Sequence, residues 1–154
     1  RPESDWPVLA TQFLSPINQA CGAVDTAALL SEATALLTKP DLRRIFTTEA
    51  LAEVDVSADL PSLGGRRIHG TIDRLVIDKA EVLAIDFKSN VAVPSEVAHC
   101  PEGILRQMAA YAEALQQIYP DHKITMAILW TKTATLMSLP DRLLSDALSR
   151  ADVS

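Results

Sequence analysis

The sequence predicts an α/β fold in which a mixed central β-sheet, an antiparallel meander plus a parallel strand, is flanked by helices. Two observations predict it. Three strand patterns follow one another over residues 53–88 with only short turns between them, which indicates an antiparallel meander. A helix pattern over residues 102–115 then precedes the next strand, and such a crossover allows that strand to pair in parallel with the meander.

The segment before the meander is predicted to be helical. Residues 5–19 are typical of a short helix broken at Pro16, and Asp25 is the expected N-cap of a helix that runs to about Leu37. A further short helix is expected over residues 40–47. With 154 residues, the chain has the length of one domain.

The meander is predicted to contain three strands. Residues 53–60 alternate polar and apolar side chains, which is the pattern of a half-buried strand, and the turn sequence 61–65 leads into the second strand. The second and third strands lie on either side of the polar break 78–81. If that break turns between Lys79 and Ala80, the register of the two strands follows directly.

In this register Asp73 and Asp86 face each other. Their Cβ atoms are expected roughly 4.5–5.5 Å apart, where two carboxylates repel unless a cation lies between them. Lys88 projects on the same face as Asp86. Hard oxygen ligands that leave positions open to water and phosphate suit Mg²⁺ or Mn²⁺, and an adjacent ammonium can activate water or stabilise charge on phosphate. These residues therefore indicate phosphodiester hydrolysis.

Each part of this pattern also has an ordinary structural interpretation. An Asp-x-Lys tripeptide is common, although Asp73 lies in an apolar strand where an unpaired carboxylate would be costly. Glu53 is expected level with Asp73, with Asp55 as its alternative, and both could equally form the solvated face of an exposed strand. Gln107 and Tyr111 lie one turn apart on one face of the expected helix, flanked by Arg106, a pair that is usually incidental.

Taken together, the motifs resemble the PD-(D/E)xK nuclease superfamily, and more closely its RecB-type nuclease domain. The resemblance rests on Gly-x-x-Asp at 70–73, Asp-x-Lys at 86–88 followed by Ser-Asn, and Gln-x-x-x-Tyr at 107–111. The upstream segment 21–59 is similar to the C-terminal nuclease domain of the AddA subunit of AddAB helicase–nucleases. The resemblance implies a restriction-endonuclease-like fold and a Mg²⁺- or Mn²⁺-dependent exodeoxyribonuclease.

The resemblance also implies a role for each motif residue. Two carboxylates and one backbone carbonyl would bind the metal, namely those of Asp73, Asp86 and Phe87. Lys88 would be the catalytic lysine, and Glu53 would assist through the metal or a bound water. The helix residues that would line the site and position the DNA are Gln107, Tyr111 and Arg106.

One element of the family pattern has no counterpart. Family members carry a metal-binding histidine on an early helix, whereas the three histidines of this chain, His69, His99 and His122, all follow Glu53. Either the chain was trimmed after the start of that helix, or its metal site departs from the family's. Two cysteines exclude the four-cysteine iron–sulphur cluster of AddB-like and Cas4-like nucleases.

The charge balance bears on how DNA would reach the site. Fourteen Lys and Arg against 20 Asp and Glu give a net charge of −6, whereas DNA-binding domains are usually basic. We therefore expect residues 1–154 to be a single nuclease domain, a C-terminal fragment of a larger helicase–nuclease, to which the helicase region delivers single strands. An AddB-like partner, a cytoplasmic location, no membrane association and a role in double-strand break repair and recombination are expected with it.

Two alternatives remain open at the level of sequence. The first is a catalytically silent relative that serves as a DNA-binding or assembly module, which the acidic composition and the missing histidine favour. The second is a metal-dependent hydrolase of nucleotides or other small phosphate esters. The second is the weaker alternative because the sequence has no glycine-rich phosphate loop.

Overall fold

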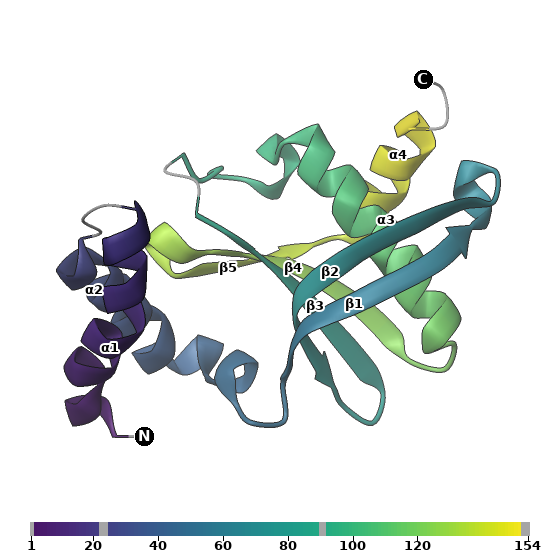
Figure 1. Ribbon diagram of the computed structural model, residues 1–154. Helices are drawn as coiled ribbons and strands as arrows, with labels where there is room; N and C mark the ends of the chain where they lie inside the picture. Colours follow the sequence, from purple (N-terminus) through teal and green to yellow (C-terminus); the bar gives the residue numbers. More distant parts are fainter. Residues whose placement is uncertain (1, 22–24, 90–91, 152–154) are drawn as a thin grey trace.

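A five-stranded sheet forms the centre of the molecule in the computed structural model, which describes residues 2–21, 25–89 and 92–151 (Figure 1). Asn90 of the predicted motif lies outside these residues. The strand order is β1-β2-β3-β4-β5. The strands are β1 (Leu51–Leu60), β2 (Arg66–Ile77), β3 (Glu81–Lys88), β4 (Lys123–Trp130) and β5 (Thr135–Leu139). The main helices are α1 (Trp6–Cys21), α2 (Thr26–Thr38), α3 (Glu102–Ile118) and α4 (Asp141–Ala151), with a 3₁₀ helix, η2 (Pro40–Phe46).

The predicted meander and its register are confirmed. Both β1–β2 and β2–β3 are antiparallel. The β2–β3 turn is closed by a hydrogen bond from the Asp78 N–H to the Glu81 carbonyl, 2.8 Å long. Arg74 pairs with Ile85. Continuing this register by one residue places Asp73 level with Asp86.

The predicted parallel strand is also confirmed. Helix α3 crosses over from β3 to β4, and the two strands pair in parallel from Glu81–Lys123 to Lys88–Trp130. Strand β5 then returns antiparallel to β4 at the edge of the sheet. The sheet is therefore mixed, with one parallel pair, as the helix between the third and fourth strands predicted.

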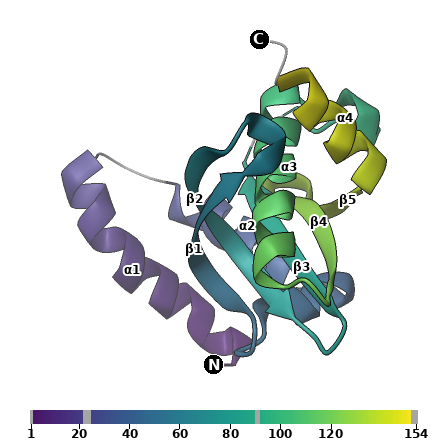
Figure 2. The same ribbon diagram turned by 90° about the vertical axis from the view of Figure 1, so that its right-hand side faces the viewer.

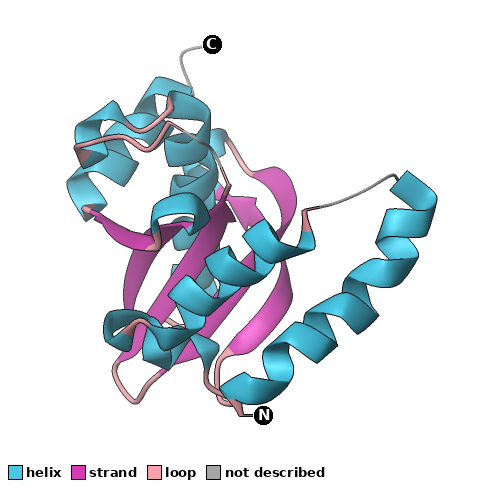
Figure 3. Cartoon of the chain, turned by 90° about the vertical axis from the view of Figure 1, so that its left-hand side faces the viewer, coloured by secondary structure: helices cyan, strands magenta, loops and turns pink. Residues whose placement is uncertain are grey.

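Helices cover the two faces of the sheet and enclose two hydrophobic clusters. Helices α3 and α4 pack on one face, in a cluster that includes Ile72 and Leu115, and we call this side the α3 face. Helix α2 and η2 cover the other face through Leu36 and Ile45, and we call this side the α2 face. Figure 3 shows α2 in front of the sheet and α1 to one side of it, and Figure 2 shows α1 standing apart from the β1–β2 hairpin.

The helices largely follow the predictions, with one correction. Asp25 caps α2 by accepting a hydrogen bond from the Ala28 N–H, as expected. The predicted break at Pro16 is wrong, because α1 continues through it to Cys21. The proline ring removes the hydrogen bond to the carbonyl of Gln12, an exposed residue whose carbonyl water can satisfy. Among the described residues, no helix has the length and apolarity needed to cross a membrane.

The packing of α3 on the sheet can be tested by truncating one buried side chain. Leu115 is 2% exposed in the cluster of the α3 face. We expect Leu115→Ala to lower the free energy of unfolding by about 2–5 kcal/mol, measured by urea denaturation, because it removes buried methyl groups and leaves a cavity. Ile118→Ala is the matched control, since this side chain of the same helix is 53% exposed. Equal losses for the two variants would contradict this packing.

Candidate active site

The carboxylates of Asp73 and Asp86 lie on neighbouring strands where β2 and β3 stop pairing. The last pair of the β2–β3 ladder is Arg74–Ile85, one residue before the two aspartates. Asp73 turns its side chain toward β3, where its Oδ2 accepts a hydrogen bond of 2.5 Å from the Phe87 N–H. The structure thus brings both predicted metal-binding aspartates to one place and ties Asp73 to the backbone of the adjacent strand.

Asp86 is the buried charged residue of the described core. It is 5% exposed in the central strand β3, and Nζ of Lys88 forms an ion pair with its Oδ2. Burial raises the pKa of the Asp86 carboxyl, and the nearby charge of Asp73 raises it further, while Lys88 acts in the opposite direction. Lys88 therefore lies beside the carboxylates, on the strand face that the sequence predicted.

Phe87 is held from the opposite side of β3. Its ring packs in the cluster of the α2 face and contacts the Phe46 ring, with the ring centroids 6.2 Å apart. The Arg74 guanidinium lies over the Phe46 ring, with its Cζ 5.9 Å from the ring centroid. These contacts fix the backbone segment whose N–H binds Asp73 and whose carbonyl was predicted as a metal ligand.

Strand β2 bends at Asp73. Strict alternation would place Ile72 and Leu75 on opposite faces, yet both are buried in the cluster of the α3 face. On β1, the register Ala52–Arg74 and Val54–Ile72 places Glu53 level with Asp73, and Glu53 has a φ of 51°. A left-handed backbone at a non-glycine residue is strained, and such strain is concentrated at functional sites.

The structure distinguishes the two upstream carboxylates. Glu53 is exposed and level with Asp73, as predicted. Asp55, its alternative, pairs with Thr71 further along the hairpin and accepts a hydrogen bond of 2.9 Å from the Thr71 hydroxyl. Glu53 is therefore the better placed of the two to act with Asp73.

Helix α3 meets β2 through Tyr111. Gln107 Nε2 donates a hydrogen bond of 3.2 Å to the Tyr111 hydroxyl, so the two predicted residues contact each other. The Tyr111 ring lies directly against Gly70, the glycine of the Gly-x-x-Asp motif. The sequence prediction assigned no contact to Gly70, although a glycine inside a strand pattern is the signal of such a close approach.

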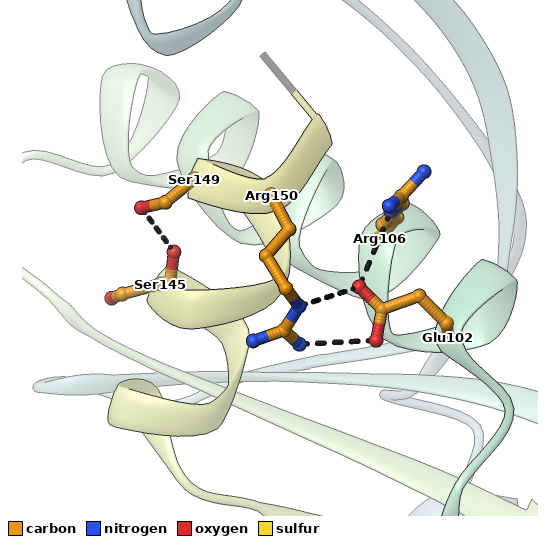
Figure 4. A network of polar contacts seen from close by, with 5 residues as sticks. All are labelled: Glu102, Arg106, Ser145, Ser149 and Arg150. Carbon is orange, nitrogen blue, oxygen red and sulfur yellow. Dashed lines mark hydrogen bonds and ion pairs between the residues drawn. The ribbon is translucent and has the colours of Figure 1, made fainter. Parts of the chain in front are cut away.

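Arg106 belongs to a different network. Its Nε contacts Glu102 at 3.3 Å, and Arg150 of α4 binds the same carboxylate through two contacts of 3.0 Å (Figure 4). Arg150, followed by Arg106, lowers the pKa of Glu102. Glu102 thus links α3 to α4 by binding Arg150, and the predicted contact of Arg106 with DNA would require Arg106 to leave Glu102 or share it.

The donor atoms fit a divalent metal ion in their chemistry. Carboxylate oxygens suit Mg²⁺ and Mn²⁺. Oδ2 of Asp86 is buried and accepts no hydrogen bond within the described residues, beyond its ion pair with Lys88, so it can accept a cation. The described part of the chain assembles no group of three or more His, Cys, Asp or Glu side chains suited to a metal ion. Two carboxylates, those of Asp73 and Asp86, lie together here and have the chemistry that such an ion requires.

The basic side chains are spread over several elements. Arg67 pairs with Asp59 on the β1–β2 hairpin, 2.8 Å apart, and Lys132 pairs with Glu32 of α2, also 2.8 Å apart. Arg44 contacts Glu81 next to the β2–β3 turn. Since acidic partners neutralise these charges in separate places, they provide little long-range attraction for a nucleic acid.

Comparison with known proteins places this chain in a family. The sequence profile of the PD-(D/E)XK nuclease superfamily matches residues 10–147. The chain belongs to this superfamily. A search of curated protein sequences found no significant match. A solved structure described as "Crystal structure of SSO0001" aligns with a TM-score of 0.40 and 14% sequence identity, over 92% of this chain and 69% of that one.

Membership gives the site its chemical context. Nucleases of the PD-(D/E)XK superfamily generally hydrolyse phosphodiester bonds and typically use Mg²⁺ or Mn²⁺. The mixed sheet flanked by helices is the fold expected of a member. The two aspartates and the lysine described above are the groups this chain offers for that chemistry.

The burial of Asp86 predicts a pH-dependent stability of the metal-free protein. Its pKa is higher in the folded than in the unfolded chain, so the folded chain holds the proton to higher pH. Stability should then fall as the pH rises above the ordinary aspartate value of about 3.9, and stay low once the folded-state pKa is passed. At pH 7, Asp86→Asn should raise the free energy of unfolding by roughly 0.5–2 kcal/mol.

Urea denaturation in EDTA between pH 4 and pH 8 measures this effect. The difference between Asp86→Asn and wild type should shrink toward the acid end. Asp78→Asn, at an exposed residue next to the turn, is the control and should change stability little at any pH. A wild-type protein that becomes more stable than Asp86→Asn as the pH rises would show that the buried carboxylate is stabilising.

Proposed function

We propose that this domain is a metal-dependent deoxyribonuclease that hydrolyses phosphodiester bonds in single DNA strands. The observation that carries the proposal is the meeting of Asp73, buried Asp86 and Lys88 where β2 and β3 stop pairing. Placing the half-buried Asp73 carboxylate beside the buried Asp86 carboxylate is unfavourable, and a bound divalent cation would offset this cost.

Each residue has a role in the proposed reaction. Asp73 and Asp86 would hold the metal with the Phe87 carbonyl, and the ion would supply Lewis-acid stabilisation of charge on the phosphate. Lys88, as an ammonium, would orient the attacking water, favour loss of its proton to solvent, or stabilise charge on the phosphate. Glu53, on β1 and level with Asp73, assists the reaction through the metal or a bound water. Gln107 and Tyr111, both on α3, position the DNA strand.

The proposed biological setting is a helicase–nuclease that acts in double-strand break repair and recombination. Its support is the likeness of residues 21–59 to the AddA nuclease domain, together with the net charge of −6 and the dispersed basic side chains. A site fed by an attached helicase needs little affinity of its own, because tethering raises the local concentration of the strand. An AddB-like subunit is the proposed partner.

One observation favours a second candidate, a catalytically silent module that binds DNA or assembles with a partner. Lys88 already neutralises Asp86, and among the described residues no third His, Cys, Asp or Glu completes a metal group with the two aspartates. A silent module would bind single-stranded DNA equally well with and without metal and would not cut it. Cleavage measurements therefore separate the two functions.

The lysine provides the sharpest test of catalysis. We expect wild type to cut a labelled linear oligonucleotide in Mg²⁺ or Mn²⁺ and not in EDTA, and to leave free nucleotides intact. Lys88→Ala should cut about 10²-fold more slowly or worse while metal and DNA affinity change by only a few-fold, because the ammonium acts mainly in the transition state. Asp86→Ala should abolish Mn²⁺ binding in calorimetry.

Lys132→Ala is the matched control, because Lys132 pairs with Glu32 on α2 rather than with the site aspartates. This variant should cut at nearly the wild-type rate. A Lys88→Ala variant as fast as Lys132→Ala would remove the lysine from the mechanism. Metal-independent binding of DNA by wild type without any cleavage would replace the nuclease by the silent module, and hydrolysis of nucleotides would replace it by a phosphate-ester hydrolase.

The strain at Glu53 predicts a conflict between stability and activity. Glycine adopts a φ of 51° without steric cost, so Glu53→Gly should raise the free energy of unfolding by up to about 1 kcal/mol. It should also slow cleavage by about tenfold or more, since its carboxylate supports the metal site. Ala134→Gly relieves the similar φ of 49° in the β4–β5 turn and should leave cleavage unchanged. Full activity in Glu53→Gly would exclude Glu53 from the reaction.

A further inference from the structure

Gly70 and Tyr111 lie so close together that no residue with a Cβ would fit at position 70 without a shift of the structure. A Cβ built on Gly70 would lie 2.7 Å from both Cε1 and Cζ of Tyr111, and closer still to its hydroxyl oxygen. Carbon atoms in contact are normally about 3.5–4.0 Å apart. The ring therefore occupies the space above the bare Cα of Gly70, and we call this contact the tyrosine seat.

The ring in the tyrosine seat has little freedom to move away. Tyr111 is 6% exposed within the cluster of the α3 face, and its hydroxyl is bonded to Gln107. It is fixed on a 17-residue helix that also packs against β4 and α4. A methyl group added at Gly70 would consequently displace β2 rather than the tyrosine.

The strand segment that would move leads directly to the site. Gly70 lies three residues before Asp73, a distance of about 10 Å along an extended strand. The strand pairs regularly with β1 from Gly70 to Ile72, and its alternation of faces breaks after Ile72, level with the strained Glu53. Asp73 then reaches the Phe87 N–H of the next strand. A hydrogen bond between two strands is sensitive to a small shift of either.

We propose that Gly70 is a positioning residue for Asp73. The tyrosine seat sets the distance between β2 and α3, and at this distance the Asp73 carboxylate reaches the Phe87 N–H. Gly70 touches neither metal nor DNA in this role. The inference rests on the proposed function for the importance of Asp73 as a ligand. The placement of Asp73 can nevertheless be observed without any metal.

Gly70→Ala tests the proposal through two readouts. The Phe87 amide signal in a metal-free ¹H–¹⁵N spectrum reports the hydrogen bond to Asp73, and calorimetry with Mn²⁺ alone reports the ligand set. We expect the Phe87 signal to move upfield with faster hydrogen exchange, and the Mn²⁺ dissociation constant to rise by about 10-fold or more, the usual loss when the support of a ligand is removed. Gly103→Ala is the control, because a Cβ there meets nothing within 4 Å.

A second substitution identifies the tyrosine as the other half of the contact. Gly70→Ala combined with Tyr111→Leu removes the ring that the new methyl group would strike, so the Phe87 signal and the Mn²⁺ affinity should move from their Gly70→Ala values to those of Tyr111→Leu alone. An unchanged Phe87 signal in Gly70→Ala would overturn the proposal. A changed signal that the second substitution leaves at its Gly70→Ala value would also overturn it, since the group that the methyl strikes would not be Tyr111.

Two further measurements keep the result decisive. If Gly70→Ala does not fold, Tyr111→Leu alone is compared with Leu115→Ala, a core truncation on the same helix. The Phe87 signal should move in Tyr111→Leu and stay in place in Leu115→Ala. The same shift, or none, in both variants would overturn the proposal. If the wild-type protein binds no Mn²⁺ and cuts no DNA, the proposed nuclease function is refuted. The Phe87 signal would still test whether Gly70 positions Asp73.

Discussion

The burial of Asp86 in the central strand is the constraint on which the site depends. Strand β3 has a strand on each side and helices on both faces, so a carboxylate there loses most of its water. In this structure the nearby ammonium of Lys88 offsets part of that cost, and Asp73 adds to it. The surrounding sheet holds the Asp73 and Asp86 carboxylates together. The same loss of water strengthens their attraction for a cation.

Strand alternation divides the work between the two faces of β3. Asp86 and Lys88 point to the same side, while the intervening Phe87 packs on the other side against Phe46 and leaves its backbone between them. The hydrophobic cluster of the α2 face thus anchors the peptide group that binds Asp73. Ordinary core packing therefore holds the backbone of the site in place.

Much of this arrangement could be predicted from the sequence because it depends on local chain geometry. The polar break at 78–81 closes a short hairpin, and the turn of a hairpin fixes its register. That register is sufficient to place Asp73 level with Asp86. The helix over residues 102–115 likewise required a crossover, and hence the parallel pairing of β3 with β4. The turn at 61–65 left Glu53 and Asp55 as alternatives, and the observed register places Glu53 level with Asp73.

Tertiary structure alone decided how these residues meet. The bend of β2 at Asp73, the left-handed backbone of Glu53 and the tyrosine seat at Gly70 all depend on segments that are distant in the sequence. Tertiary structure also brought Arg150 of α4 to Glu102, the i,i+4 partner of Arg106 within α3. Periodicity and turn chemistry determine strand order and register because they act over a few residues, whereas side-chain partners depend on which elements pack together.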